Sequence, residues 1–154
     1  MSDLEVRIVQ LEPMRVAYAL GFGSSPEEIA WNKILAFGKS KGLLDDLDKI
    51  RFFGFNNPDP SPGSPNYGYE QWMTVGEEFE AEGDVKIKDF LGGLYAVTRF
   101  KGLSNIGRVW KELVVWQEDS KYKHGQHQWS EELLVPPGTP HEELVFDLYL
   151  PIIE

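Results

Sequence analysis

Carboxylates that alternate with large aromatic side chains are the residues of this sequence best suited to chemistry. Glu70 and Trp72 lie two positions apart, as do Trp129 and Glu131, so each pair falls on one face of an expected strand. Aromatic rings attract an organic cation by dispersion and through their π faces, and a carboxylate neutralises its charge away from water. The pattern therefore predicts a site for a small apolar or cationic molecule, unless the rings are plain core and the carboxylates are solvated.

Other reaction chemistries lack their motifs in this chain. There is no cysteine, and the three histidines do not have the spacing of a zinc motif, so we expect no metal and no cofactor. Ser130 is not within a Gly-x-Ser-x-Gly turn, and Gly92-Gly93 precedes an expected strand rather than a helix. These features argue against a serine hydrolase and against a phosphate-binding loop. The acidic run 45–48 lacks the glycine and the glutamate of a calcium loop.

The composition limits the class of protein and of partner. A net charge of −10 argues against direct binding of nucleic acid, because phosphate binding depends on clustered lysine and arginine. With 42% hydrophobic and 26% charged residues, we expect one globular domain over residues 1–154. Five Trp, six Tyr and nine Phe are enough to line a ligand site as well as to fill a hydrophobic core. No secretory signal or membrane-length apolar segment is visible, so we expect a cytoplasmic protein without a membrane partner.

Hydrophobic periodicity and turn residues predict an α+β protein. Strands are expected over 5–11, 14–21, 50–55 and 67–75 in the first half, and over 93–100, 128–135 and 144–152 in the second. The segment 25–28 is a capping box with proline at the first helical position, and Gly42 is expected to end this helix. A second helix is expected after Ser104, a predicted N-cap. The loop within 56–65 contains four prolines and no regular structure is expected there.

The two halves match each other along the chain. The tripeptides Tyr18-Ala19-Leu20 and Tyr95-Ala96-Val97 lie 77 positions apart, and 69–75 lies 77 positions before 146–152. Trp31 and Trp110 lie 79 positions apart, which indicates a two-residue insertion. A period this long with two copies favours a duplication with pseudo-twofold symmetry over a solenoid.

The duplication defines halves at about 4–76 and 90–153, joined by an acidic connector over 77–88. A ligand cleft is expected between the two halves, where such sites commonly form.

Four segments, taken in order, resemble the effector-binding domain family, which includes the GyrI-like proteins and the ligand domains of multidrug-sensing transcription regulators. They are Phe53-Gly54-Phe55-Asn56-Asn57-Pro58, Tyr67-Gly68-Tyr69-Glu70-Gln71-Trp72, Gly92-Gly93-Leu94-Tyr95-Ala96-Val97, and Glu131 followed by Phe146-Asp147-Leu148-Tyr149-Leu150-Pro151. The second segment is similar to stand-alone, integron-cassette-associated members that bind cationic drugs. The resemblance covers nearly the whole chain.

This resemblance implies two βαββ units around a cleft that is lined by aromatic side chains and contains a buried glutamate. In the family that glutamate lies on the strand before the last, which places the role on Glu131. A register slip of one residue would turn Glu132 inward instead. The ligand-binding residues expected from the strand faces and the resemblance together are Tyr18, Phe55, Glu70, Trp72, Tyr95, Trp110, Trp129, Glu131 and Tyr149.

Three functions fit these features. The leading hypothesis is a stand-alone protein that binds lipophilic, cationic small molecules, for drug sequestration or for sensing linked to transcription regulation. No helix-turn-helix precedes the domain, so DNA would be reached only through a protein partner. The resemblance also implies a hydrolase of reactive small molecules, with Glu131 as general base. The third hypothesis is a protein inhibitor of a partner such as gyrase, acting through its acidic surface.

Overall fold

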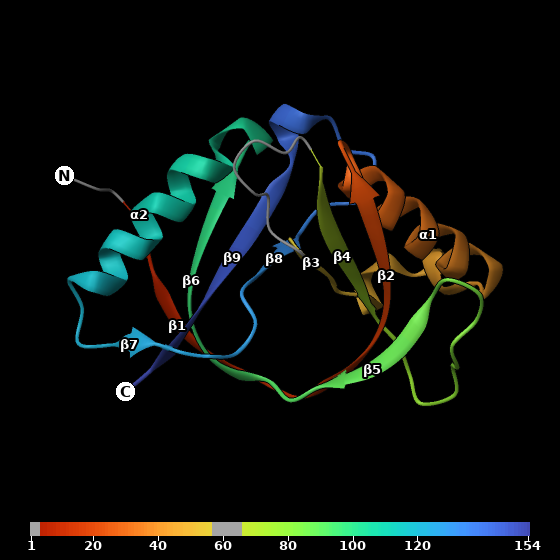
Figure 1. The fold of residues 1–154 in the computed structure, drawn as a ribbon, viewed down its shortest axis with the longest axis horizontal. Helices are drawn as coiled ribbons and strands as arrows, with labels where there is room; N and C mark the ends of the chain where they lie inside the picture. Colours follow the sequence, from red (N-terminus) through yellow and green to blue (C-terminus); the bar gives the residue numbers. More distant parts are fainter. Residues whose placement is uncertain (1–3, 57–65) are drawn as a thin grey trace. The chain divides into compact units, whose positions relative to one another are not determined.

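Two helices and a set of antiparallel strands make up the described residues, 4–56 and 66–154, of this computed structural model (Figure 1). The predicted α+β class is confirmed. All seven predicted strands are present, and their ends are displaced by no more than two residues. Most of the proline-rich loop predicted within 56–65 lies outside the described residues. No helix in the described part of the chain is long and apolar enough to cross a membrane.

The first compact unit comprises Met14–Phe90. Its strands are ordered β3-β4-β2-β5, and all three pairings are antiparallel. Its elements are β2 (Met14–Gly23), α1 (Pro26–Ser40), the 3₁₀ turns η1 (Leu43–Asp45) and η2 (Leu47–Lys49), β3 (Phe52–Asn56), β4 (Tyr67–Thr74) and β5 (Lys86–Phe90). Strand β5 lies partly within the segment predicted to be a connector, because its apolar residues, Ile87 and Phe90, show no two-residue alternation.

Helix α1 packs along β2 and β4 (Figure 1). It begins at Pro26 as predicted, but Ser25 makes no side-chain capping hydrogen bond, so the capping box is wrong in that detail. The helix ends where Gly42 adopts a left-handed conformation (φ 72°), which glycine tolerates without steric cost. Close approach of α1 to β2 depends on Gly21, since a Cβ there would lie 2.2 Å from the carbonyl oxygen of Pro26.

The second compact unit combines residues 4–13 with 91–154. Its strands are ordered β1-β6-β9-β8, and β7 also pairs with β9. Its elements are β1 (Arg7–Leu11), β6 (Gly93–Lys101), η3 (Leu103–Asn105), α2 (Ile106–Glu118), β7 (Lys123–His124), β8 (Ser130–Leu133), η4 (His141–Glu143) and β9 (Val145–Ile153). The predicted N-cap Ser104 is wrong, because Ser104 lies in η3 and Asn105 precedes the α-helix.

The two units share one strand order, but the strands that precede β2 and β6 in the chain, β1 and β5, each pair within the other unit. Strand β1 precedes β2 in the chain and pairs with β6, whereas β5 precedes β6 and pairs with β2. The compact units therefore do not coincide with the repeat read along the sequence. The pseudo-twofold axis, the single domain over 1–154 and the ligand cleft all stay predictions.

Strand register corrects one part of the repeat alignment. Trp72 lies opposite Tyr18, whereas Tyr149, 77 positions after Trp72, lies opposite Val97. Tyr18 therefore corresponds to Val97 rather than to Tyr95, an offset of 79. The offset of 77 begins with β3, since Phe53 faces Trp72 as Ser130 faces Tyr149. The two-residue insertion thus lies after the first helix, not before it.

Candidate functional site

A buried carboxylate lies among aromatic rings in the first unit. Glu70 and Trp72 share one face of β4, as their spacing predicts, and Tyr18 and Phe55 lie opposite them on the neighbouring strands. Glu70 is only 3% exposed. The indole Nε1 of Trp72 donates a 2.5 Å hydrogen bond to Glu70 Oε2. The structure thus brings together four of the nine predicted ligand-binding residues.

Lysine 88 of β5 completes this cluster. Lys88 Nζ donates to the same Oε2 of Glu70 and lies 4.2 Å from the ring centroid of Tyr18 and 5.0 Å from that of Trp72. Phe90, also on β5, packs against Trp72 with ring centroids 5.1 Å apart. Lys88 and Phe90 were not predicted from the sequence, because the apolar residues of 86–90, Ile87 and Phe90, are three positions apart and show no two-residue alternation.

A second buried carboxylate lies beside tyrosines in the second unit. The hydroxyl of Tyr149 donates a 2.7 Å hydrogen bond to Glu132 Oε1, and Glu132 is 6% exposed. The rings of Tyr149 and Tyr95 meet edge to face with centroids 5.4 Å apart. Tyr95 donates its own hydroxyl to the carbonyl of Gln128 at 2.5 Å, and burial raises the pKa of that hydroxyl above its ordinary value of 10.0.

The register of β8 decides which neighbouring glutamate faces these tyrosines. Glu132 lies opposite Asp147 and Glu131 opposite Leu148, so the two carboxylates are on opposite faces of the strand. Glu131 is half-buried. The alternative stated from the sequence was a one-residue slip that turns Glu132 inward, and Glu132 is the more buried of the two glutamates. A ligand-binding role for either glutamate stays a prediction.

Trp129 and Trp110 form a separate group. Their ring centroids are 5.5 Å apart, and His124 stacks on Trp129 at 5.6 Å. Trp129 is 37% exposed and directly precedes β8. The predicted site residues therefore fall into three groups, Tyr18, Phe55, Glu70 and Trp72, then Tyr95 and Tyr149, then Trp110 and Trp129, whereas Glu131 lies on the other face of β8 from Glu132.

A third buried acid, Asp147, is held by two arginines. Arg7 donates to it at 2.8 Å, and Arg99 donates through two nitrogens at 2.9 and 3.2 Å. The hydrogen bond and the negative charge of Asp147 raise the pKa of the Arg99 guanidinium. Asp147 occupies in β9 the position that Glu70 occupies in β4, 77 residues earlier. In each unit, an acid on a central strand thus pairs with a basic residue on the edge strand, Glu70 with Lys88 and Asp147 with Arg7.

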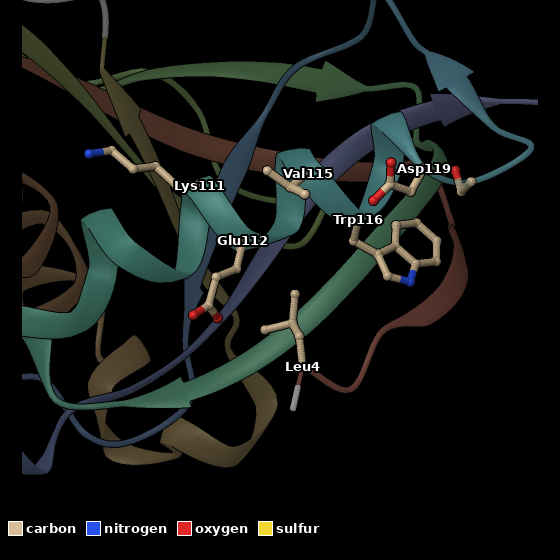
Figure 2. A pocket seen from close by; sticks show the side chains of 7 residues that line it. Leu4, Lys111, Glu112, Val115, Trp116 and Asp119 are labelled. Carbon is tan, nitrogen blue, oxygen red and sulfur yellow. The ribbon is translucent and has the colours of Figure 1, made fainter. Parts of the chain in front are cut away.

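Residues of α2 and Leu4 line a pocket of about 530 Å³, and Figure 2 shows their side chains. Leu4, Val115 and Trp116 are its apolar lining, with Lys111, Glu112 and Asp119 around them. None of the nine predicted ligand-binding residues lines it. Among the described residues, no group of three His, Cys, Asp or Glu side chains could hold a metal ion.

Three solved structures share this fold at low sequence identity. EcmrR, solved in complex with DNA, matches with a TM-score of 0.75 at 12% identity, over 98% of this chain but only 58% of that one. A hydrolase from Listeria innocua matches with a TM-score of 0.72 at 13% identity, over 97% of this chain and 92% of that one. SAV2435, solved with tetraphenylphosphonium bound, has a TM-score of 0.53 at 12% identity, over 97% and 94%. At these identities the likeness concerns the fold alone. No curated protein matches the chain in sequence.

The sequence profile of one family covers nearly the whole chain. The profile of the GyrI-like small molecule binding domain matches residues 4–153. That range includes both compact units, all nine predicted ligand-binding residues and the acids at 70, 132 and 147. This chain therefore belongs to the GyrI-like small molecule binding domain family.

Proposed function

We propose that this protein binds a lipophilic organic cation, with the carboxylate of Glu132 facing the positive charge and the rings of Tyr95 and Tyr149 contacting its apolar groups. The observation that carries the proposal is the buried Glu132 carboxylate in contact with the Tyr149 hydroxyl. SAV2435, which has this fold, was solved with a lipophilic cation bound. Such binding would serve drug sequestration or sensing in the cytoplasm.

The physical argument concerns the difference between a charged and a neutral ligand. A carboxylate that is already buried has lost most of its hydration, so an incoming cation gains Coulomb attraction in a region of low dielectric. The hydroxyl of Tyr149 holds the carboxylate in place, and the negative charge of Glu132 also contributes to the raised pKa of the Arg99 guanidinium. Edge-to-face tyrosines supply dispersion to cationic and neutral ligands alike.

The test compares tetraphenylphosphonium with triphenylphosphine oxide, a neutral molecule of related shape, by calorimetric titration. Glu132→Gln should weaken binding of the cation by about 30-fold or more, the scale of removing one partner of a buried ion pair. Binding of the neutral oxide should change by less than about threefold. The matched control is Glu131→Gln, which removes the same charge one residue away and on the other face of β8; it should alter either affinity by less than about threefold.

Equal losses for the two ligands in Glu132→Gln would overturn the charge-recognition proposal. A larger effect at Glu131 than at Glu132 would return the role to the glutamate that the family resemblance implies. No binding of either compound to the folded wild-type protein would count against the lipophilic-cation class altogether.

A second candidate function is hydrolysis of a reactive small molecule. The specific observation in its favour is the 2.7 Å contact between Tyr149 and Glu132, which places a proton donor beside a potential general base. In this role Glu132 takes a proton from the attacking water, and the single O–H of Tyr149 orients the carboxylate that takes it. Incubating electrophilic esters or epoxides in ¹⁸O-labelled water and following product mass would detect it. Turnover that Glu132→Gln abolishes, with binding retained, would favour the enzyme over the binder.

A further inference from the structure

The first unit contains a carboxylate, two aromatic rings and an ammonium group arranged as a cation site that is already filled. We infer that Glu70, Trp72 and Tyr18 form a second cation-binding site, distinct from the one proposed at Glu132, and that Lys88 is its internal occupant. A primary alkylammonium ion binds there by taking the place of the Lys88 ammonium group.

The anion of this site is fixed, whereas its cation can leave. Glu70 is 3% exposed and lies on β4, which has β2 on one side and β3 on the other. The side chain of Lys88 is 37% exposed and lies on β5, for which β2 is the only strand partner among the described residues. When the flexible lysine side chain turns outward, its ammonium group is rehydrated at little cost in free energy. The buried Glu70 carboxylate stays in place on β4. A buried carboxylate with an exchangeable counter-ion is the minimal requirement of a cation site.

The equivalent acid of the second unit lacks this property. Asp147 accepts hydrogen bonds from Arg7 and from two nitrogens of Arg99, so two planar guanidinium groups hold it. A cation that replaced Arg7 and Arg99 at Asp147 would have to break several charge-assisted hydrogen bonds together. A single lysine lying over rings, as at Glu70, presents one point charge on four methylenes. The two units therefore differ in the base that holds this acid, which is a lysine at Glu70 and a pair of arginines at Asp147.

The geometry selects the chemical class of the ligand. Glu70 Oε2 accepts hydrogen bonds from both Trp72 Nε1 and Lys88 Nζ, so the cation must carry an N–H group. The nitrogen lies 4.2 Å from the Tyr18 centroid and 5.0 Å from the Trp72 centroid, distances suited to a compact ammonium head. The alkyl chain leaves along the path of the lysine stem, toward solvent. A quaternary phosphonium has no N–H and does not meet these conditions.

Replacing Lys88 by alanine opens the site, and propylammonium then supplies the atoms that the substitution removes. The indole ¹H–¹⁵N signal of Trp72, assigned by its absence in Trp72→Phe, reports on binding because that N–H donates to Glu70. In Lys88→Ala, propylammonium should shift this signal saturably, with an apparent Kd at least about tenfold lower than in the wild-type protein. Propanol, which lacks the charge, should give no saturable shift. Adding Glu70→Gln to Lys88→Ala should weaken propylammonium binding by about tenfold or more.

Lys86→Ala is the matched control, since Lys86 is an exposed lysine on the same face of β5, two residues from Lys88. Its response to propylammonium should equal that of the wild-type protein. If Lys88→Ala fails to fold, the wild-type protein provides the test. The Lys88 Cε protons lie near two rings, and high propylammonium should move their NMR shifts toward solvent values while those of Lys86 stay in place.

Propylammonium binding to Lys88→Ala that persists unchanged after Glu70→Gln would overturn the inference. So would the absence of a saturable Trp72 shift in folded Lys88→Ala, or unmoved Lys88 signals where only the wild-type protein folds. Glu132→Gln should leave the propylammonium response unchanged. Tetraphenylphosphonium binding should depend on Glu132 and not on Lys88, so failure at one site is distinguishable from failure at the other.

Discussion

Tyr149 on β9 donates a hydrogen bond of 2.7 Å to the carboxylate of Glu132 on β8, and both side chains are buried. The two residues come from neighbouring antiparallel strands, with Ser130 directly opposite Tyr149 and Glu132 two positions further along. This contact orients the Glu132 carboxylate beside Tyr95 and Tyr149. We therefore expect its removal to lower the free energy of unfolding.

Tyr149→Phe should lower the free energy of unfolding by about 1–2 kcal/mol, because the substitution removes a donor from a buried carboxylate while keeping the ring. Urea unfolding followed by tryptophan fluorescence measures this change. Tyr122→Phe is the control: Tyr122 stacks on Trp116 with centroids 6.2 Å apart, and that contact survives loss of the hydroxyl. A change of less than about 0.5 kcal/mol is expected there. Equal effects at the two tyrosines would contradict a specific role for the Glu132 contact.

Asp147→Asn should destabilise the protein by about 2–3 kcal/mol, because two charge-assisted interactions with Arg7 and Arg99 depend on a buried negative charge. Asp89→Asn provides the comparison, since Asp89 is largely exposed and lies 3.7 Å from Arg15. An exposed ion pair of this kind contributes less than about 1 kcal/mol and is screened by salt. Chemical unfolding at low and high ionic strength would measure both. Similar losses at the two aspartates would show that burial of Asp147 adds nothing.

The hydroxyl of Tyr95 should make the free energy of unfolding depend on pH in the alkaline range. Burial raises its pKa in the folded protein above the ordinary value of 10.0, so at high pH the folded state retains a proton that the unfolded chain releases. This contribution is fully present below about pH 10 and is lost as the pH rises above that value. Unfolding free energy should therefore fall more steeply above about pH 10 in the wild-type protein than in Tyr95→Phe. Parallel pH profiles for the two proteins would contradict the prediction.

Two glycines should respond to alanine in opposite directions. A Cβ at Gly21 would lie 2.2 Å from the Pro26 carbonyl oxygen and 2.9 Å from the Ala30 nitrogen, both backbone atoms that cannot turn away. Gly21→Ala should cost about 2 kcal/mol or more in unfolding free energy, since α1 must move off β2. At Gly107 in α2 an added Cβ would meet nothing within 4 Å apart from its chain neighbours and the backbone of its own helix, so Gly107→Ala should be neutral or stabilise by up to about 1 kcal/mol. Thermal unfolding of both variants tests the contrast.

Local features of the sequence predict the elements well. Strand alternation placed Glu70 with Trp72 on one face, and Pro26 and Gly42 marked the ends of α1, because these signals depend on neighbours within a few residues. The family assignment likewise follows from short segments kept in order along the chain. Strands β5 and β7 were not predicted, because the apolar residues of β5, Ile87 and Phe90, show no two-residue alternation and β7 has only two residues.

Which strands pair, and in which register, could not be predicted from patterns of neighbouring residues. Whether Glu131 or Glu132 lies beside Tyr149 depends on the register of β8 against β9, and a slip of one residue exchanges the two faces. The bond between Lys88 and Glu70 requires β5 to pair with β2, which precedes it by more than 60 residues, rather than with the adjacent β6. The sequence by itself thus determined the family, the elements and the faces on which most candidate side chains lie. The tertiary structure alone decided which acids contact which aromatic rings and which basic side chains. The physical reason is that strand pairing joins residues far apart in the sequence and depends on the packing of the whole unit.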